Sequence, residues 1–219
     1  MLGAAYGILE EGIMVKSFFD PAWMDLGVLG SYGRWAGVNW VWAIMLTIYH
    51  TTFRIAIPIL VAQVMFPSRR EDPWVDTRTF RFLVLLISAV TVIGFLWLTP
   101  YRPPVIPYLG TLFLVFGIAY AAWRLPYLPQ AMSIGRKLLS VKRLVAFGFV
   151  ATACYFLILY AGPFLIPSPV LSVLLGFTFV AIVGMLLSDL SQKGLQESHQ
   201  FALAAGALGF LILLAPLQE

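Results

Sequence analysis

The stretch from Val38 to Phe66, VNWVWAIMLTIYHTTFRIAIPILVAQVMF, is almost entirely apolar and is long enough to cross a lipid bilayer. Such a segment is expected to be helical, because lipid offers the backbone no hydrogen-bond partners. The chain of 219 residues is 61% hydrophobic and 11% charged, whereas soluble domains contain about 25% charged residues. These features predict an all-α protein, a polytopic transmembrane helical bundle.

Apolar segments of this kind recur along the whole chain and predict about seven spans. They cover residues of about 2–18, 38–66, 80–99, 106–124, 143–165, 169–188 and 201–217. The short connections leave no room for a soluble domain, so we expect one integral membrane domain over residues 1–219. The first segment starts directly after Met1, which also fits a chain whose earlier helices are missing. The basic stretch after the fourth segment favours a short amphipathic helix at the lipid surface.

The basic residues predict the orientation of the bundle. The connections after the second, fourth and sixth segments, with the adjoining helix ends, hold ten of them: Arg69, Arg70, Arg78, Arg81, Arg124, Arg136, Lys137, Lys142, Arg143 and Lys193. The opposite side holds only Lys16, Arg34 and Arg102. Because cytoplasmic loops are enriched in Lys and Arg, the N-terminus is expected in the cytoplasm and the aromatic segment 17–40 outside.

This asymmetry also accounts for the net charge of +4 without a nucleic-acid partner. No basic stripe interleaved with aromatic residues, the pattern of nucleic-acid binding, is present in the sequence. We therefore expect a multi-pass protein of the cell (plasma) membrane whose partner is the lipid bilayer. The oligomeric state stays open.

One face of the predicted helix 38–66 is polar. Residues on it recur every three or four positions, the spacing of a single helical face. They are Thr47, His50, Thr51, Arg54 and Pro58. Ionisable groups at membrane depth are costly and normally face a bundle interior or a wet cavity.

Glu10 and Glu11 are the other deep ionisable residues and lie in the first apolar segment. At ~1.5 Å per residue, Glu10 lies roughly 12 Å below the outer end of its helix and His50 roughly 15 Å below the outer end of the next. The groups are therefore expected to meet in the outer half of the bilayer. Arg54 is expected as the buried charge partner one turn deeper, whereas Lys16 is expected to reach the outer interface.

The first two segments are also predicted to pack together. Gly3 and Gly7 form a small-xxx-small face that permits close helix contact in a membrane, and Glu11 continues that face.

Two carboxylates, one guanidinium and one imidazole do not balance in charge unless the group takes up a proton. The sequence therefore predicts a coupled proton-binding or catalytic site formed by Glu10, Glu11 and His50. The structural alternative is that a Glu–Arg pair only fixes the register of two helices.

A Glu-Glu pair followed some 40 residues later by a helix-borne histidine resembles the CAAX-protease and bacteriocin-processing (CPBP, or Abi) intramembrane metalloproteases. Their pattern is EExxxR, then FxxxH, then HxxxN or HxxxD. The resemblance implies that Glu10, Glu11 and His50 activate a water for peptide cleavage, with a divalent metal such as zinc as a cofactor. Val15 stands at the position of the arginine and Leu46 at that of the phenylalanine.

Three functions remain open from the sequence. The first is an intramembrane hydrolase acting on a peptide, and the second is a transporter that uses the same group to couple protons or cations. The third is a non-catalytic membrane scaffold or subunit. His199, the other histidine, is followed by Leu203 where the family pattern has Asn or Asp. No internal repeat of the kind found in many transporters is visible in the sequence.

Overall fold

The computed structural model describes residues 1–70, 72–125 and 139–217, and these are helical over most of their length. Contacts between residues divide the chain into two compact units. The first comprises Met1–Pro58 and Phe66–Pro126, and the second comprises Ile59–Met65 and Tyr127–Glu219.

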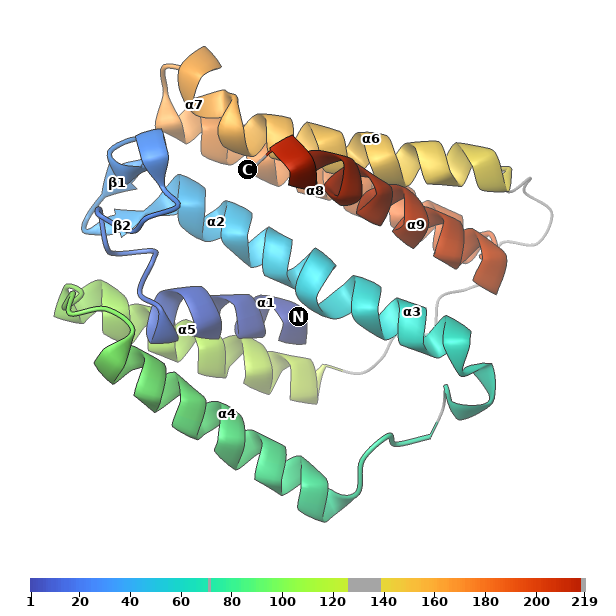
Figure 1. Ribbon diagram of the computed structural model, residues 1–219, viewed down its shortest axis with the longest axis horizontal. Coiled ribbons are helices and arrows are strands. Elements are labelled where there is room, and N and C mark those ends of the chain that lie inside the picture. The colour runs from blue at the N-terminus through green and yellow to red at the C-terminus, as the bar shows by residue number, and fades with distance from the viewer. Residues whose placement is uncertain (71, 126–138, 218–219) are drawn as a thin grey trace. The chain divides into compact units, whose positions relative to one another are not determined.

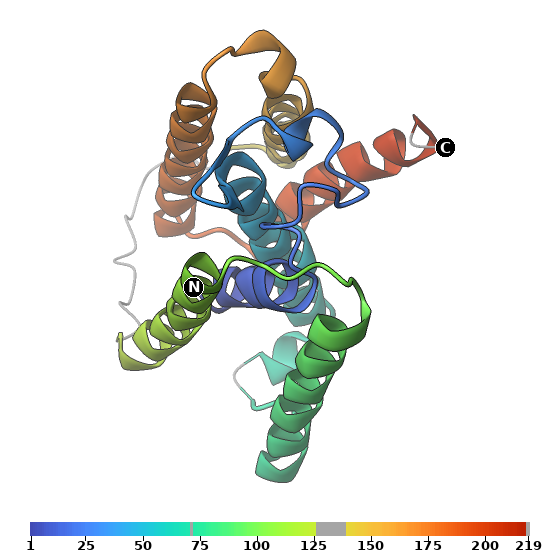
Figure 2. The same ribbon diagram turned by 90° about the vertical axis from the view of Figure 1, so that its left-hand side faces the viewer.

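The first unit is built around a short N-terminal helix. This helix, α1 (Leu2–Ile8), continues without a break into the π-helical segment η1 (Leu9–Met14). Beside it runs α2 (Trp40–Tyr49), which passes into a second π-helical segment, η3 (His50–Ala56), and then into α3 (Ile57–Met65), whose residues from Ile59 onward belong to the second unit. Two long helices, α4 (Thr77–Trp97) and α5 (Val105–Arg124), complete the unit after the short 3-10 helix η4 (Pro67–Arg69). Figure 1 shows α1 beside α5 and α2, and Figure 2 shows the same arrangement from the side.

The segment between η1 and α2 is folded and packed. It contains the 3-10 helix η2 (Gly27–Gly30) and a small hairpin of β1 (Arg34–Trp35) and β2 (Val38–Asn39). Ala36 and Gly37 make the hairpin turn with φ of 51° and 78°, as a tight two-residue turn requires. Phe19 and Asn39 are fully buried, and Asn39 accepts the backbone N–H of Trp42 at 3.0 Å to cap α2. The aromatic segment 17–40 therefore closes one end of this unit.

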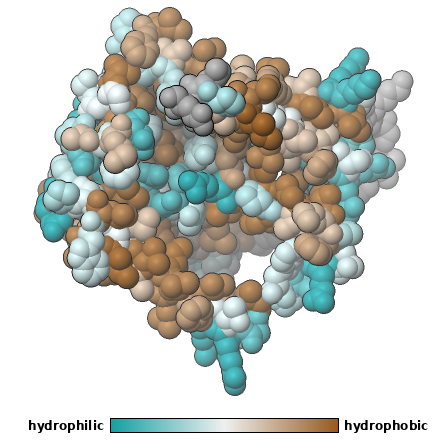
Figure 3. All heavy atoms as spheres, in the orientation of Figure 1, coloured by the Kyte–Doolittle hydropathy of each residue, from teal (hydrophilic) through white to brown (hydrophobic). Residues whose placement is uncertain are grey.

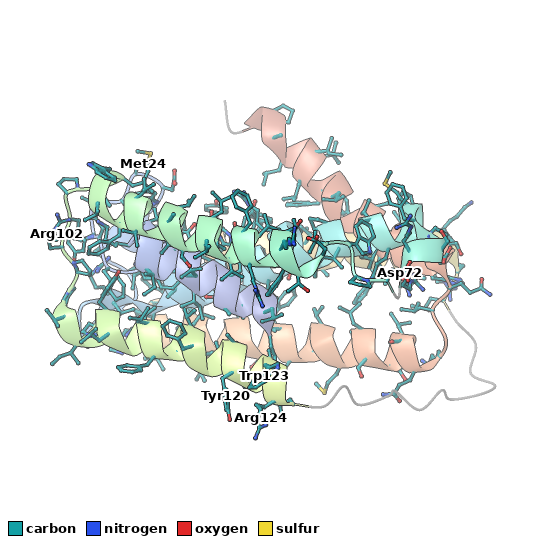
Figure 4. The ribbon with its side chains drawn as sticks, turned by 90° about the horizontal axis from the view of Figure 1, so that it is seen from below. Met24, Asp72, Arg102, Tyr120, Trp123 and Arg124 are labelled. Atoms are coloured by element: carbon teal, nitrogen blue, oxygen red, sulfur yellow. The ribbon has the colours of Figure 1, made fainter. Side chains whose placement is uncertain are left out.

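The two ends of the first unit are chemically distinct. Met24 and Arg102 lie at one end and Asp72 at the other (Figure 4). Tyr120, Trp123 and Arg124 gather at the end of α5, where the guanidinium lies 5.9 and 5.8 Å from the two ring centroids. Aromatic rings with a basic residue are typical of a membrane–water interface.

Helix α4 shows how the unit meets lipid. Most of its side chains are apolar and exposed, and Gly94 is its one buried residue. In Figure 3 apolar side chains cover this helix and hydrophilic ones gather at the bottom of the view, where α4 begins. There Asp76 caps the helix by accepting the N–H of Thr79 at 2.7 Å, and hydrogen bonds from Thr79 hold the pKa of the Asp76 carboxyl below its usual value. An apolar exposed helix of this length indicates a transmembrane segment.

Six helices of the described residues are long and apolar enough to cross a membrane, which indicates a multi-pass membrane protein. They are Trp40–Met65, Thr77–Trp97, Val105–Arg124, Val141–Tyr160, Pro169–Gln192 and Glu197–Leu214. The predicted seventh span is not confirmed, because the first helical run ends at Met14. Its 7 α-helical and 6 π-helical residues extend over roughly 20 Å, less than the ~30 Å of a bilayer core.

The second unit contains the remaining spans. They are α6 (Val141–Tyr160), α8 (Pro169–Gln192) and α9 (Glu197–Leu214), with the short α7 (Gly162–Leu165) after α6 and the 3-10 helix η5 (Ala215–Leu217) at the end. Helices α6 and α9 pack most closely, and Leu144, Leu190 and Ala202 form a buried cluster at one end of the unit. The predicted amphipathic helix in the basic stretch falls mainly on residues 126–138, outside the described residues.

Candidate functional site

Two glycines bring the first helix into contact with the polar face of the second. A Cβ on Gly3 would lie 3.1 Å from Cα of Thr51, and one on Gly7 would lie 2.8 Å from Cβ of His50. Side chains at these positions would hold the helices apart, so only glycine permits this approach. The predicted packing of these two segments through Gly3 and Gly7 is confirmed.

His50 lies between the two glutamates at the centre of this contact. Its Nε2 is 3.0 Å from Oε1 of Glu11, and its Nδ1 is 3.1 Å from Oε2 of Glu10. The His50 side chain is 2% exposed, while the side chains of Glu10 and Glu11 are 20% and 14% exposed. The predicted meeting of these three side chains is therefore confirmed.

All three residues lie on π-helical turns, Glu10 and Glu11 in η1 and His50 at the first position of η3. Such turns are rare and occur frequently at functional sites. Their wider spacing lets two consecutive glutamates reach one imidazole ring. The apolar pattern of both segments predicted regular helix, and no feature of the sequence distinguishes a π turn.

The Glu11 side of the site is closed by a chain of hydrogen bonds. Ser17 donates its hydroxyl to Oε2 of Glu11 at 2.5 Å, and the indole Nε1–H of Trp42 donates to Oγ of Ser17 at 3.1 Å. Ser17 is fully buried and Trp42 is 4% exposed. Neither residue was predicted as part of the site. A tryptophan near the end of a membrane segment is typical of the membrane interface, and a single serine beside two phenylalanines carries no sequence signal.

The Glu10 side is less satisfied and more open. Oε2 of Glu10 and Nδ1 of His50 face each other, but their angles do not meet those of a hydrogen bond. Both atoms are buried, and neither has a hydrogen-bond partner among the described residues. The ring of Tyr6 lies on this side as well, with its centroid 6.1 Å from that of His50. The site therefore has one fixed and one loosely held carboxylate.

Arg54 is not the buried partner that the sequence predicted. It is exposed, and among the described residues it forms no ion pair with either glutamate. Its charge acts on Glu10 only at longer range. The direct partner of both carboxylates is instead His50.

Thr47 and Thr51, the other predicted members of the polar face, hydrogen-bond within their own helix. Their hydroxyls donate to the backbone carbonyls of Ala43 and Thr47 at 2.7 and 2.6 Å. Such back-bonding removes the hydroxyl proton from contact with any ligand and often bends a helix. Both residues lie against the glycine face of α1, so they contribute packing to the site.

Lys16 does not reach the outer interface, and that prediction is wrong. It is fully buried, and its Nζ donates to the carbonyls of Phe95, Thr99 and Tyr101 at 2.8, 2.9 and 3.2 Å. The carbonyl of Phe95 lies in the last turn of α4, and those of Thr99 and Tyr101 come after the helix. None of the three has a hydrogen-bond donor within the helix. Lys16 therefore closes the C-terminal end of α4.

Glu10, Glu11 and His50 are also the residues that could hold a metal ion. One potential ligand atom from each lies within 4.8 Å of the others. The carboxylates, however, face different ring nitrogens, whose lone pairs diverge, and one ion can take only one nitrogen of a ring. An ion bound by all three would require one carboxylate to leave its nitrogen, so the observed arrangement fits a proton better than a metal.

Fold and site together define a multi-pass helical membrane protein with a buried Glu–Glu–His group. Comparisons with family models, curated proteins and solved structures found no match. The function must therefore be argued from the geometry of the group itself.

Proposed function

We propose that the protein is a proton-coupled carrier of the cell membrane, in which Glu10, Glu11 and His50 bind and release the coupling proton. The observation that supports this proposal is a single buried imidazole facing one carboxylate at each of its two nitrogens. A neutral imidazole has one N–H and one acceptor nitrogen, and the acceptor would repel an ionised carboxylate. The group therefore holds an extra proton, either on the ring or on a glutamate.

The charges show why this proton can be exchanged. With an imidazolium and two carboxylates, the group carries one net negative charge, with the exposed Arg54 nearby. Moving the Nδ1 proton to Oε2 of Glu10 leaves a neutral ring, a neutral acid and the same net charge. The proton then sits on Glu10, whose side chain is 20% exposed against 14% for Glu11, and it leaves through the more exposed of the two side chains. Three titrating groups of this kind behave as one coupled site.

A reconstitution experiment tests the proposal. Purified protein is placed in liposomes with a trapped pH-sensitive dye, and a proton gradient is imposed with and without gradients of Na⁺, K⁺, Mg²⁺ or Ca²⁺. Wild type should acidify or alkalinise the lumen faster than empty liposomes. Glu11→Gln and His50→Gln should each lose about tenfold or more of that rate.

The chain offers a matched control for the histidine substitution. His199 lies in α9, in the second unit, and His199→Gln should leave the flux unchanged. The double variant Glu11→Gln/His50→Gln should be little worse than either single variant, because residues of one coupled group are not additive. Wild-type flux equal to that of empty liposomes under every gradient contradicts the carrier.

The close spacing of three possible ligand atoms supports a second candidate, a metal-dependent intramembrane hydrolase that resembles the CPBP proteases. In that function a divalent ion would replace the shared proton, and Glu10, Glu11 and His50 would hold it. Stoichiometric Zn²⁺ binding that Glu11→Gln abolishes, with metal-dependent cleavage of a membrane peptide, would favour the hydrolase. Proton flux that a chelator leaves intact would favour the carrier.

A further inference from the structure

Ser17 and Trp42 determine the direction of the hydrogen bonds on one side of the site. An indole N–H can only donate, so the bond from Trp42 to Oγ of Ser17 uses the serine oxygen as an acceptor. The single hydroxyl proton of Ser17 then goes to the nearer of its two acceptors, Oε2 of Glu11 at 2.5 Å, rather than to the Glu11 carbonyl at 3.4 Å. The shorter distance is typical of a hydroxyl donating to an ionised carboxylate.

The same logic extends to the ring of His50. The 2.5 Å bond from Ser17 to Oε2 assigns Glu11 as an ionised carboxylate, and an ionised carboxylate can only accept, so the Oε1 that lies 3.0 Å from Nε2 is an acceptor as well. With Oε1 as the acceptor, Nε2 carries the proton of this contact. Nδ1 is the nitrogen left to gain or lose a proton, and the unpartnered Oε2 of Glu10 faces it.

Burial separates the two sides in the same way. Ser17 and Trp42, which close the Glu11 side, are at most 4% exposed, and the side chain of Glu10 is 20% exposed against 14% for that of Glu11. The titratable and charged groups around the ring are Tyr6 from α1, the two glutamates of η1, Tyr49 from α2 and Arg54 from η3. None of them donates a hydrogen bond to Nδ1 among the described residues.

We propose that Ser17 and Trp42 are positioning residues that hold Glu11 as the fixed acceptor of the His50 Nε2–H, so that the exchangeable proton of the site moves between Nδ1 and Glu10. This inference rests on the proposed function only in one respect, namely that the exchangeable proton is the one coupled to transport. The bond from Trp42 to Ser17 has its direction from the indole, which can only donate, and the Nε2–H follows from the ionised state assigned to Glu11.

The chain makes a direct test possible because it contains only two histidines. In a His199→Gln background, ¹⁵N-histidine labelling leaves one imidazole signal, whose shifts report which nitrogen is protonated. When the ring becomes neutral at raised pH, its proton should remain on Nε2. Ser17→Ala and Trp42→Phe should each speed hydrogen exchange of Nε2–H about tenfold or populate the Nδ1–H tautomer. Ser17→Thr retains the hydroxyl and should restore the wild-type signal.

Three results would overturn the inference: a neutral wild-type ring protonated on Nδ1, unchanged Nε2–H exchange in both variants, or a ring doubly protonated wherever the protein is folded. If Ser17→Ala does not fold, Trp42→Phe alone decides, since it removes only the indole and keeps the serine. Failure of the carrier function is separate, because it would abolish flux in liposomes without changing the tautomer.

Discussion

Lys16 shows how one buried cation can hold two helices together. Its backbone lies in the left-handed region with φ of 66°, which turns the chain sharply after η1 and directs the side chain toward α4. The ammonium then donates to three carbonyls at the end of α4 and lies 4.7 Å from the ring centroid of Phe95. A cation at a helix C-terminus also interacts favourably with the helix dipole.

Lys16→Met should destabilise the protein by about 3 kcal/mol, because buried carbonyls would lose their donor. Arg54→Met should have little effect on stability, since Arg54 is exposed and makes no direct ion pair in the described chain. Chemical unfolding of both variants in detergent micelles measures the difference. Equal stabilities would show that Lys16 does not cap α4.

The sequence could predict the residues of the site better than their partners. Matching depth on two adjacent helices was enough to bring Glu10, Glu11 and His50 together. The partners of Ser17 and Lys16 could not be predicted, because they depend on the left-handed backbone of Lys16, which a sequence pattern does not reveal. Arg54 was assigned to the interior because charge in a membrane segment normally turns inward.

At the scale of helices, the glycine contacts fix the distance between α1 and the second span. Gly7→Ala would place a methyl group 2.8 Å from Cβ of His50, so the ring must move away from the glutamates. Overpacking of this kind costs about 1–3 kcal/mol. Gly117→Ala is the control, because no heavy atom of a neighbour lies within 4 Å of that position on α5.

Unfolding curves and the ¹⁵N signal of His50 would measure both effects. The Gly7→Ala variant should be less stable and show a shifted imidazole signal, whereas the Gly117→Ala variant should match wild type or gain slightly in helix propensity. A Gly7→Ala variant with wild-type stability and an unchanged signal would refute the close helix contact.

In the second unit, α6 and α9 approach so closely that their backbones touch. A Cβ on Gly206 would lie 2.0 Å from the carbonyl oxygen of Val145, a backbone atom that cannot rotate away. Gly206→Ala should therefore separate the helices and cost at least about 1–3 kcal/mol. Gly209→Ala on the same helix meets nothing within 4 Å and should be tolerated. Thermal unfolding of the two variants in micelles gives the comparison, and equal midpoints would argue against the packing.

Helix content and most helix positions could be predicted from the sequence, because apolar length alone identifies a span. The first helix was predicted too long. Its apolar residues continue to Phe19, but the backbone leaves the helix after Met14 and buries Phe18 and Phe19 in the folded segment that follows. Apolar composition cannot distinguish a residue buried in lipid from one buried in protein.

At the scale of the molecule, the first unit has a strongly basic end. Around Asp72 and the start of α4 lie Arg69, Arg70, Arg78 and Arg81, and α5 ends at Arg124. The end marked by Met24 holds Arg34 and Arg102, because Lys16 is buried and engaged with α4. The positive-inside rule counts basic residues in the connections, so removing Lys16 from the count strengthens the asymmetry.

This asymmetry predicts that Met24 faces the outside and Asp72 the cytoplasm, whether or not the first helical run crosses the bilayer. In a Cys154→Ser background, which removes the one native cysteine, Met24→Cys should react with an impermeant thiol reagent on intact cells, since Met24 is 83% exposed. Asp72→Cys should react only after the cells are permeabilised, because α2 to α3 separates the two positions by a full span. The Cys154→Ser protein alone is the control for background labelling. Labelling of Asp72→Cys on intact cells, with Met24→Cys protected, would invert the orientation and place the Glu–Glu–His group nearer the cytoplasmic face.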